Sequence, residues 1–312
     1  MGRSKSVMIT GCAGFIGSHT AERFLDAGYR VVGVDAMTYA ARRSNIKECL
    51  NNENFTFYEM DICDNTEIKL LVQKYNIDWI INLAAETHVD KSIIDCTAFI
   101  RSNIEGVKSL LEVGRELKTK LLHISTDEVY GEIRKGSFRE DSPLEPRNPY
   151  SATKAASEHL IRAYANTYGI EYKMVRPSNN FGPRQHDEKL LPTVIRNLKS
   201  GNKVPVYGDG KQVREWTYVK YTAEAILFVL EHAPVNDVYN VSSGCEMENI
   251  EIIKQICSMM GKDFSLSIEN IPDRAGHDFR YSVCPDKLNN IGFRMQHDTI
   301  SQIAHTIEKS YE

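Results

Sequence analysis

Two residues near the middle of the chain have the types and spacing needed for proton transfer. Tyr150 and Lys154 lie four residues apart in the run YSATK, so on a helix both side chains project from the same face. A tyrosine hydroxyl has an unperturbed pKa of about 10, and a nearby positive charge stabilises its ionised form. The pair can therefore act as a base toward a hydroxyl group, although the same spacing also occurs on solvated helix faces.

A second group of reactive side chains lies earlier, in the segment STDEVYG. Thr126 offers a hydroxyl group, and Asp127 and Glu128 place two carboxyl groups side by side. Burial and mutual repulsion can drive the pKa values of adjacent acids apart, leaving one protonated and one ionised at neutral pH. Such a pair suits an elimination, in which one group removes a proton and the other protonates a leaving hydroxyl. The alternative is that both acids are solvated loop residues.

The elements that would position these groups follow an alternating pattern. Short apolar runs separated by amphipathic stretches predict buried strands joined by crossover helices, at 7–10, 31–35, 55–60, 79–84 and 121–125. Residues 171–176 and 238–241 have the same character. We therefore expect an α/β fold with a doubly wound parallel sheet. In such a sheet ligands bind outside the carboxyl ends of the strands, where Thr126 to Glu128 would lie.

A glycine-rich turn follows the first expected strand. Gly11 permits a tight turn, Gly14 lets the backbone approach a pyrophosphate, and Gly17 lets helix and strand pack closely. Asp35 ends the second expected strand, and its carboxylate can accept hydrogen bonds from both ribose hydroxyls of a dinucleotide. We expect NAD rather than NADP, because that carboxylate would repel a 2′-phosphate.

Two alternatives to this cofactor assignment remain open. Arg42 and Arg43 follow Asp35 closely, and either could bind a 2′-phosphate. The three glycines could also serve only as packing devices.

The alternating pattern ends near residue 177. Beyond it the chain is punctuated by prolines and rich in loops, without a Pro- or Ser-rich linker. We predict that residues 1–177 form an NAD-binding domain and that residues 178–312 mainly form a smaller substrate-binding lobe. A strand near 238–242 is expected to return to the sheet of the first domain.

Four segments together resemble the nucleotide-sugar 4,6-dehydratases, a family of the extended short-chain dehydrogenase/reductase superfamily. They are LAAETHVD at 83–90, Thr126 to Glu128, Tyr150 to Lys154, and DRAGHDFRY at 273–281. The glycine spacing at 11–17 is similar to that of the superfamily, and the likeness covers nearly the whole chain. The Asp-Glu pair is the most specific element, since related 4-epimerases and sugar decarboxylases usually carry Ser or a single acid there.

The resemblance implies a hydro-lyase that converts a nucleotide-glucose to its 4-keto-6-deoxy form, with dTDP-glucose favoured and UDP-glucose possible. C4 is oxidised, water is lost across C5 and C6, and hydride returns to C6. Tyr150 would take the 4-hydroxyl proton, Glu128 the C5 proton, and Asp127 would protonate the leaving 6-hydroxyl. Thr126 would hydrogen-bond the 4-oxygen, and Lys154 would hold the nicotinamide ribose and lower the tyrosine pKa.

The resemblance also implies two sets of binding residues. The cofactor set is Gly11, Gly14, Phe15, Ile16, Gly17, Asp35, Thr38, Asp61, Ile62, Leu83, Ala84, Ala85, Ser102, Tyr150, Lys154 and Asn180. The substrate set is Thr87, Thr126, Asn179, Lys189, Leu190, Pro205, Tyr207, Arg214, Asn249, Arg274 and His277. Arginines can also form forked hydrogen bonds with phosphate on chemical grounds. Asp61 could instead only cap a helix.

Composition argues against several other classes of protein. The 312 residues include 38 Lys and Arg against 42 acidic residues, a formal charge of −4 that favours no nucleic-acid partner. No apolar run approaches the roughly 18 residues that a membrane span needs. The seven cysteines contain no C-x-x-C pair, which predicts reduced thiols, a cytoplasmic location and no metal site.

Two other functions compete with dehydration. A nucleotide-sugar 4-epimerase would need Tyr150, Lys154 and NAD but not the paired acids, and a silent NAD-binding sensor would need none of the acid–base groups. The helices expected at 96–117 and 150–168 could belong to the core or form a homodimer through a four-helix contact, which the resemblance implies. His123 is expected inside a buried strand.

Overall fold

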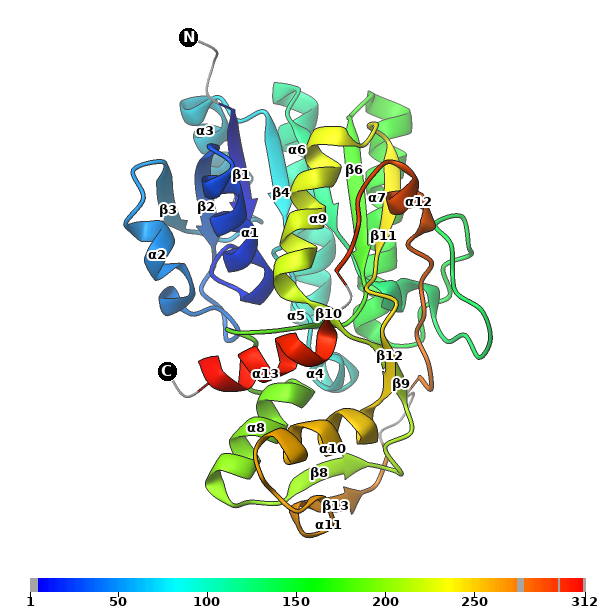
Figure 1. Cartoon of the computed structure of the whole chain (residues 1–312). Helices are drawn as coiled ribbons and strands as arrows, with labels where there is room; N and C mark the ends of the chain where they lie inside the picture. The colour runs from blue at the N-terminus through cyan, green and yellow to red at the C-terminus, as the bar shows by residue number, and fades with distance from the viewer. Residues whose placement is uncertain (1–4, 274–277, 297, 311–312) are drawn as a thin grey trace.

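The central feature of the computed structural model is a parallel sheet of seven strands with helices on both faces (Figure 1). The structure describes residues 5–273, 278–296 and 298–310. The strands are β1 (Ser6–Thr10), β2 (Arg30–Asp35), β3 (Phe55–Glu59), β4 (Trp79–Asn82), β5 (Lys120–Ile124), β6 (Tyr172–Pro177) and β11 (Asp237–Val241). Their order is β11-β6-β5-β4-β1-β2-β3, and each neighbouring pair is parallel. The expected doubly wound fold is confirmed.

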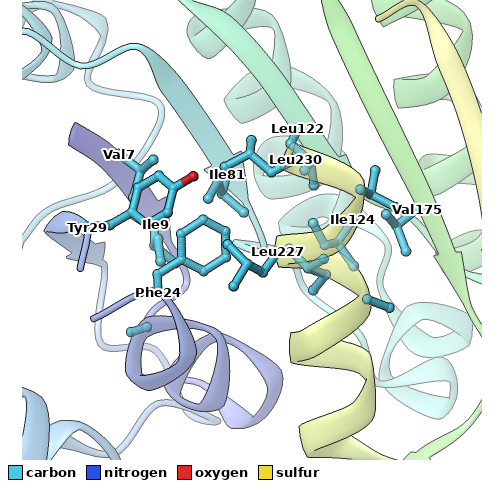
Figure 2. Close-up of a cluster of buried hydrophobic side chains, with 14 of the residues drawn as sticks. Val7, Ile9, Phe24, Tyr29, Ile81, Leu122, Ile124, Val175, Leu227 and Leu230 are labelled. Atoms are coloured by element: carbon cyan, nitrogen blue, oxygen red, sulfur yellow. The ribbon is translucent and has the colours of Figure 1, made fainter. Parts of the chain in front are cut away.

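Alternating side chains of the strands bury two separate cores. Val7 and Ile9 of β1 face a core covered by α1 (Phe15–Asp26) and α9 (Val219–His232), shown in Figure 2. Met8, between them, faces the opposite core under α3 (Asn65–Tyr75), α6 (Gly106–Leu117) and α7 (Pro149–Tyr168). Because successive strand residues point to opposite faces, a sheet buried on both sides needs this nearly continuous apolar sequence.

The strand order reverses at β1. From β1 the chain first builds β2 and β3 on one side and then β4, β5 and β6 on the other. The loops that leave β1 and β4 therefore diverge, and a crevice opens between them at the carboxyl ends of the strands. Those ends face the smaller lobe in Figure 1.

The smaller lobe is less regular. Its elements are β7 (Asn180–Phe181), α8 (Leu190–Ser200), β8 (Val204–Tyr207), β9 (Val213–Glu215), β10 (Thr217–Tyr218), β12 (Glu246–Glu248), α10 (Asn249–Met259), α11 (Phe264–Ser267), β13 (Ile268–Ile271) and α13 (Thr299–Lys309). The short strands pair two by two, β10 with β7, β12 with β9 and β13 with β8. A third apolar core joins α8, α10 and α13. Between β10 and β12 the chain returns through α9 and β11 to the large sheet.

Short helical segments complete the fold. They are η1 (Arg43–Ile46), α2 (Lys47–Leu50), α4 (Val89–Ile94), α5 (Thr97–Ile100), η2 (Arg101–Glu105), η3 (Asp127–Tyr130) and α12 (Asp286–Asn290). Among the described residues no helix combines the length and apolar character needed to cross a membrane.

The helix expected at 96–117 is interrupted by a π-helical turn, η2, between α5 and α6. The turn includes Asn103, whose Oδ1 accepts from the Glu86 backbone N at 2.9 Å. Its Nδ2 donates to the Glu86 carbonyl oxygen at 3.0 Å and to Thr153 Oγ1 at 2.9 Å. One side chain thus fixes the loop after β4 against α7.

Candidate active site

The crevice at the carboxyl ends of the strands is one continuous cleft formed by two adjoining pockets. Both pockets are lined by Gly11, Gly14, Ala40, Leu83 and Ala85. The outer pocket extends past β2 and β3 toward η2, and the inner pocket extends past β5 and α7 toward the chain that follows β6. An elongated ligand can therefore bind across the switch point of the sheet.

The glycine-rich turn requires glycine at its first and last positions. Gly11 has φ +68°, and a Cβ there would lie 2.7 Å from the Ala84 backbone nitrogen. A Cβ on Gly17 would lie 2.0 Å from the Gly11 carbonyl oxygen, so α1 packs directly on the turn. Gly14 is different, because within the described residues its Cβ would meet only the Gly11 carbonyl oxygen, at 3.2 Å, and Gly14 lines the cleft. This leaves an open cradle at the N-terminus of α1, which suits a phosphate group.

The carboxylate of Asp35 lies at the end of β2 and lines the same cleft. It accepts hydrogen bonds from the backbone N–H groups of Ala13 and Met37, each at 2.9 Å, which hold it in place. Each carboxylate oxygen keeps a further lone pair for a ligand hydroxyl. Burial raises the pKa of Asp35.

The two arginines that could have bound a 2′-phosphate are engaged elsewhere. Arg42 Nη2 lies 2.9 Å from Asp187 Oδ2. Arg43 lies 3.9 Å from Glu59 Oε2, and its guanidinium stacks over Phe57. These pairings favour a cofactor without the additional phosphate.

The outer pocket contains further residues of the predicted cofactor set. Thr38, Ile62 and Ser102 line it together with Asp61. Asp61 forms an ion pair with Arg101 at 2.8 Å and accepts from the Cys63 backbone N at 2.8 Å. It is not the helix cap, since Asp64 accepts from the Glu67 backbone N at the start of α3.

Tyr150 lies in the first turn of α7, where the local sequence fixes the helix start. Asn148 Oδ1 accepts from the Ser151 backbone N at 2.9 Å, and the Ser151 hydroxyl bonds back to Asn148 in a capping box. Pro149 supplies the first helical residue. Burial and the negative charge of Glu128 raise the pKa of Tyr150, and a hydrogen bond with Thr126 acts in the opposite direction. Ionisation of this phenol near neutral pH therefore requires a positive charge beside it.

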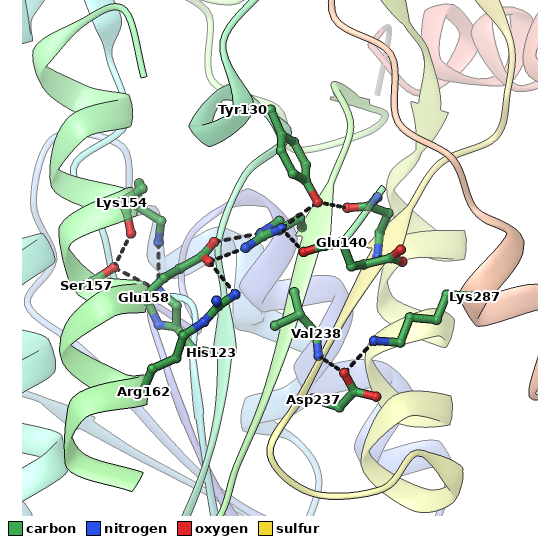
Figure 3. A network of polar contacts seen from close by, with 12 residues as sticks. His123, Tyr130, Glu140, Lys154, Ser157, Glu158, Arg162, Asp237, Val238 and Lys287 are labelled. Atoms are coloured by element: carbon green, nitrogen blue, oxygen red, sulfur yellow. Dashed lines mark hydrogen bonds and ion pairs between the residues drawn. The ribbon is translucent and has the colours of Figure 1, made fainter. Parts of the chain in front are cut away.

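Lys154 lies one turn further along α7 and is 3% exposed. Its Nζ donates to the Ile124 carbonyl oxygen at 2.6 Å, at the end of β5, and lies 3.4 Å from His123 Nε2 (Figure 3). Burial lowers the pKa of Lys154 to about 8, while Glu158 acts in the opposite direction. Tyr150 and Lys154 both line the inner pocket.

The segment after β5 forms the short helix η3, which Thr126 caps. Thr126 Oγ1 accepts from the Glu128 backbone N at 3.3 Å and lies 3.3 Å from Asp127 Oδ1. Asn148 Nδ2 donates to Glu128 Oε2 at 3.3 Å. Asn148 therefore connects Glu128 to the helix that carries Tyr150.

Asp127 is buried at the floor of the cleft, with 3% of its surface exposed. Burial first, and then the charges of Glu128 and Glu215, raise its pKa well above the usual value, while Arg214 acts in the opposite direction. Asp127 therefore retains its proton at a pH at which exposed carboxyl groups are ionised. The alternative that both acids are solvated loop residues is wrong for Asp127.

Several buried polar atoms of the cleft wall have no hydrogen-bond partner within the described part of the chain. They are Ser125 Oγ, Asp127 Oδ2, Asn179 Oδ1, Asn180 Oδ1 and Gln185 Oε1. Buried polar groups without a partner are costly and therefore uncommon. Their concentration in one cleft indicates a site built for a ligand rich in hydroxyl and amide groups.

The structure separates the predicted substrate residues into two sets. Thr87, Thr126, Asn179 and Lys189 line the inner pocket. The others lie beyond it in the smaller lobe: Leu190 begins α8, Pro205 and Tyr207 are on β8, Arg214 is on β9, and Asn249 begins α10. Arg274 and His277 lie outside the described residues.

The guanidinium of Arg214 is already held by the protein. Its Nη2 donates to the Asp278 carbonyl oxygen at 2.8 Å, and it stacks over the Tyr281 ring. It is buried and lies close enough to influence Asp127.

Glu188 is a pocket residue that sequence reasoning missed. Its carboxylate lies 3.4 Å from ring nitrogens of His88 and His186, 3.9 Å from Lys91 Nζ, and accepts from the Tyr39 hydroxyl at 3.3 Å. It thereby connects the segment between β7 and α8 to α4 and to the segment after β2. Its position directly before Lys189 was the available signal in the sequence.

The parallel sheet, the glycine turn at its switch point and the adjacent Tyr-x-x-x-Lys helix define an enzyme of the extended short-chain dehydrogenase/reductase class. Residues 8–303 match the model of the family described as GDP-mannose 4,6 dehydratase, and the chain belongs to that family.

Similar curated proteins support this assignment. The chain is 44% identical over 289 residues to the low-salt glycan biosynthesis protein Agl12 of Haloferax volcanii, covering 92% of each chain. It is 40% identical over 321 residues to a dTDP-glucose 4,6-dehydratase of Xanthomonas campestris, covering 96% of this chain and 92% of the other.

Solved structures show the same architecture. The dTDP-glucose 4,6-dehydratase DesIV of Streptomyces venezuelae, determined with NAD bound, has a TM-score of 0.95 and 37% identity, covering 98% of this chain and 97% of the other. The UDP-glucose 4-epimerase of Thermotoga maritima has a TM-score of 0.91 and 26% identity, covering 98% of each chain. The epimerase is the more distant of the two.

Proposed function

We propose that this protein is a hydro-lyase that uses NAD to convert dTDP-glucose to dTDP-4-keto-6-deoxyglucose and water. The observation that carries the proposal is the pair of adjacent carboxyl groups with unlike surroundings. Asp127 is buried and its pKa is raised by that burial, whereas Glu128 lines the cleft and accepts from Asn148. A 4-epimerase has no step that uses such a pair. The named activity of the 40% identical relative and the NAD in the DesIV structure support the same assignment.

The cleft fits NAD. Gly14 provides the cradle for the pyrophosphate, Asp35 the acceptors for the ribose hydroxyls, and Lys154 a donor for the second ribose. Asn180 and Ser125 provide buried side-chain oxygens in the inner pocket that have no hydrogen-bond partner among the described residues. When bound, NAD accepts the hydride from C4 of the sugar and later returns it to C6.

The first task of the protein is to take the proton of the 4-hydroxyl group. Tyr150 is the base, and its buried phenol must be ionised by positive charge near it. Lys154, one turn along the same helix face, provides part of that charge. Thr126, beside the phenol, donates to the same sugar oxygen and holds it in line.

The second task is elimination of water. Once C4 carries a ketone, the C5 proton is acidic, and the Glu128 carboxylate removes it. Asp127, which keeps its proton through burial, gives it to the 6-hydroxyl so that water leaves. The C5 proton then returns from Glu128, and the proton taken by Tyr150 replaces the one that Asp127 gave. The net change is the loss of one water molecule.

The smaller lobe would hold the nucleotide. We propose the division made from the sequence, with residues 1–177 and the strand near 238–242 binding NAD and residues 178–312 mainly binding the nucleotide sugar. The buried guanidinium of Arg214, on β9 of the smaller lobe, supplies positive charge near Asp127. Tyr207, 39% exposed, offers a ring on which a base can stack.

We further propose a cytoplasmic homodimer that pairs α6 and α7 of two copies. The two helices lie side by side, with the Tyr164 hydroxyl donating to Glu112 at 2.5 Å. Tyr168, at the end of α7, is 45% exposed. The cytoplasmic location is supported by seven cysteines that all carry free thiols. Light scattering on the purified protein tests the dimer, and a monomeric mass contradicts it.

The function is tested by incubating the protein and NAD separately with dTDP-glucose, UDP-glucose, UDP-N-acetylglucosamine and GDP-mannose, and identifying products by mass spectrometry and NMR. We expect a product that has lost one water molecule and gained a methyl group at C6. We expect turnover of dTDP-glucose to be faster than that of the other three substrates. A product of unchanged mass would mean an epimerase. No turnover of any of the four would contradict the proposal.

A further inference from the structure

His123 is a buried titratable side chain that the proposed mechanism does not use. It lies on β5, two residues before Ser125, and is 1% exposed. Burial, and then the charge of Lys154, hold the pKa of the imidazole well below its usual value, so the ring is neutral at physiological pH. A neutral imidazole has one nitrogen that donates and one that accepts a hydrogen bond.

The Nε2 atom of His123 faces α7. It lies 3.4 Å from Lys154 Nζ and 3.2 Å from Ser157 Oγ (Figure 3). The hydroxyl hydrogen of Ser157 is donated to the Lys154 carbonyl oxygen at 2.7 Å. The ammonium of Lys154 carries three hydrogens, of which one goes to the Ile124 carbonyl oxygen at 2.6 Å. A second hydrogen can be directed at Nε2, provided that Nε2 is the accepting nitrogen.

The other side of the ring permits this arrangement. Asn82 Nδ2 lies 3.0 Å from Nδ1, and Asn82 Oδ1 accepts from the Thr10 hydroxyl at 2.7 Å. A half-turn of the amide exchanges its oxygen and nitrogen, so Asn82 can accept from Nδ1–H and donate to the Thr10 hydroxyl. With the amide turned in this way, the contacts of Thr10, Asn82 and His123 are compatible with the tautomer that accepts from a charged Lys154.

Several elements pack around His123 and Lys154 and contribute charged or polar groups. On α7, Glu158 raises the pKa of Lys154, and Glu158 is itself bound by Arg176 of β6. β1 and β4 contribute the neutral Thr10 and Asn82. The cleft side carries Tyr150 on α7 and the acids 127 and 128 on η3.

We propose that His123 is a positioning residue for the reaction: its imidazole accepts a hydrogen bond from the Lys154 ammonium and holds the charged side chain against the end of β5. Lys154 then keeps its charge and direction where it acts beside Tyr150. The inference rests on the proposed function, in which that charge stabilises the Tyr150 phenolate. Because burial already brings the pKa of Lys154 to about 8, loss of one acceptor changes the charge of Lys154 within a measurable pH range.

The test compares the pH dependence of kcat/KM for dTDP-glucose in the wild type, His123→Leu and His123→Gln. Leucine removes the acceptor, so the alkaline limb moves to lower pH by about one unit, the size expected for one hydrogen bond to a charged group. Glutamine can place its carbonyl oxygen near the former Nε2 and restores the limb. Ser157→Ala, which alters the same side of the ring but leaves the acceptor, keeps the limb of the wild type.

A second readout is the pH dependence of NAD affinity, measured by calorimetry, which should shift in the same direction. If His123→Leu does not fold, His123→Asn replaces it, because its shorter amide reaches toward Asn82 but not Lys154. If kcat/KM falls by the same factor at every pH in the variants and the alkaline limb does not move, the proposal is overturned. His123 then has only a packing role. Absence of wild-type turnover in the same assay instead overturns the proposed function, so the two failures are distinguishable.

Discussion

Asp127 and Glu128 are adjacent in the chain, yet their carboxyl groups have different surroundings. Asp127 is 3% exposed, and its Oδ2 has no hydrogen-bond partner in the described residues, whereas Glu128 accepts from Asn148 at 3.3 Å and lines the open cleft. The buried acid holds its proton, and its neighbour is placed to accept one. An elimination needs one group that donates a proton and one that accepts a proton, both in contact with the same substrate.

Removing either carboxyl group should strongly slow elimination and spare binding of NAD and substrate. For Asp127→Asn and Glu128→Gln we expect product formation to fall about 10²- to 10⁴-fold, since each replaces an acid–base group by an amide of the same shape. Product is measured by mass spectrometry, and NAD and dTDP-glucose affinities by calorimetry. Asp141→Asn, an exposed loop acid, is the control. Near wild-type turnover in either cleft variant would falsify the assigned roles.

The raised pKa of Asp127 also predicts how stability depends on pH. The folded protein keeps the Asp127 proton, whereas the unfolded chain releases it above about pH 4. This contribution is therefore fully present below that pH and is lost as pH rises toward the folded pKa. Asp127→Asn lacks the ionisable group and should gain stability relative to the wild type between pH 5 and pH 8.

Urea unfolding of both proteins at the two pH values measures this effect. A stability difference that is the same at pH 5 and pH 8 would show that Asp127 is ionised in the folded protein. The proton donor of the elimination would then have to be another group.

Two glycines three residues apart should respond differently to the same change. Gly17→Ala places a Cβ 2.0 Å from the Gly11 carbonyl oxygen, so the turn must move. We expect the free energy of unfolding to fall by about 2–3 kcal/mol and NAD binding to be lost. Gly14→Ala meets one atom at 3.2 Å and should fold nearly normally, while its methyl group occupies the phosphate cradle.

Thermal unfolding and calorimetric titration with NAD separate the two outcomes. Gly14→Ala should lose affinity with little change in melting temperature. If it binds NAD as the wild type does, the pyrophosphate lies elsewhere than at the N-terminus of α1.

A buried ion pair supports the helix that carries Tyr150. Glu158 of α7 and Arg176 of β6 are both 0% exposed and form two hydrogen bonds, at 2.9 and 2.5 Å, within the network around Tyr130 and Glu140 (Figure 3). Glu158→Gln leaves the arginine charge buried without its counter-ion, so we expect a loss of about 3–5 kcal/mol.

The matched control is Glu116→Gln, which removes an exposed partner of Lys69 and should cost less than about 1 kcal/mol. Urea midpoints of the two variants give the comparison. Equal, small effects would mean that the Arg176 charge is compensated by other groups.

Much of the fold follows from local patterns in the chain. Runs such as Val31 to Asp35 are apolar over the length of a strand, and buried parallel strands need that pattern whatever surrounds them. The Gly11 turn and the four-residue spacing of Tyr150 and Lys154 are likewise properties of short segments. These signals suffice for the sheet, the cofactor turn and the reactive pair.

Other properties of the site depend on residues brought together from distant parts of the chain. Which of two adjacent acids keeps its proton depends on burial and on Glu215 and Arg214, almost 90 positions away. The π-helical turn at Asn103 and the position of Glu188 among two histidines and a lysine have no local signature. Protonation and ligand access are set by the charge and solvent around a group, and only the folded chain brings those surroundings together.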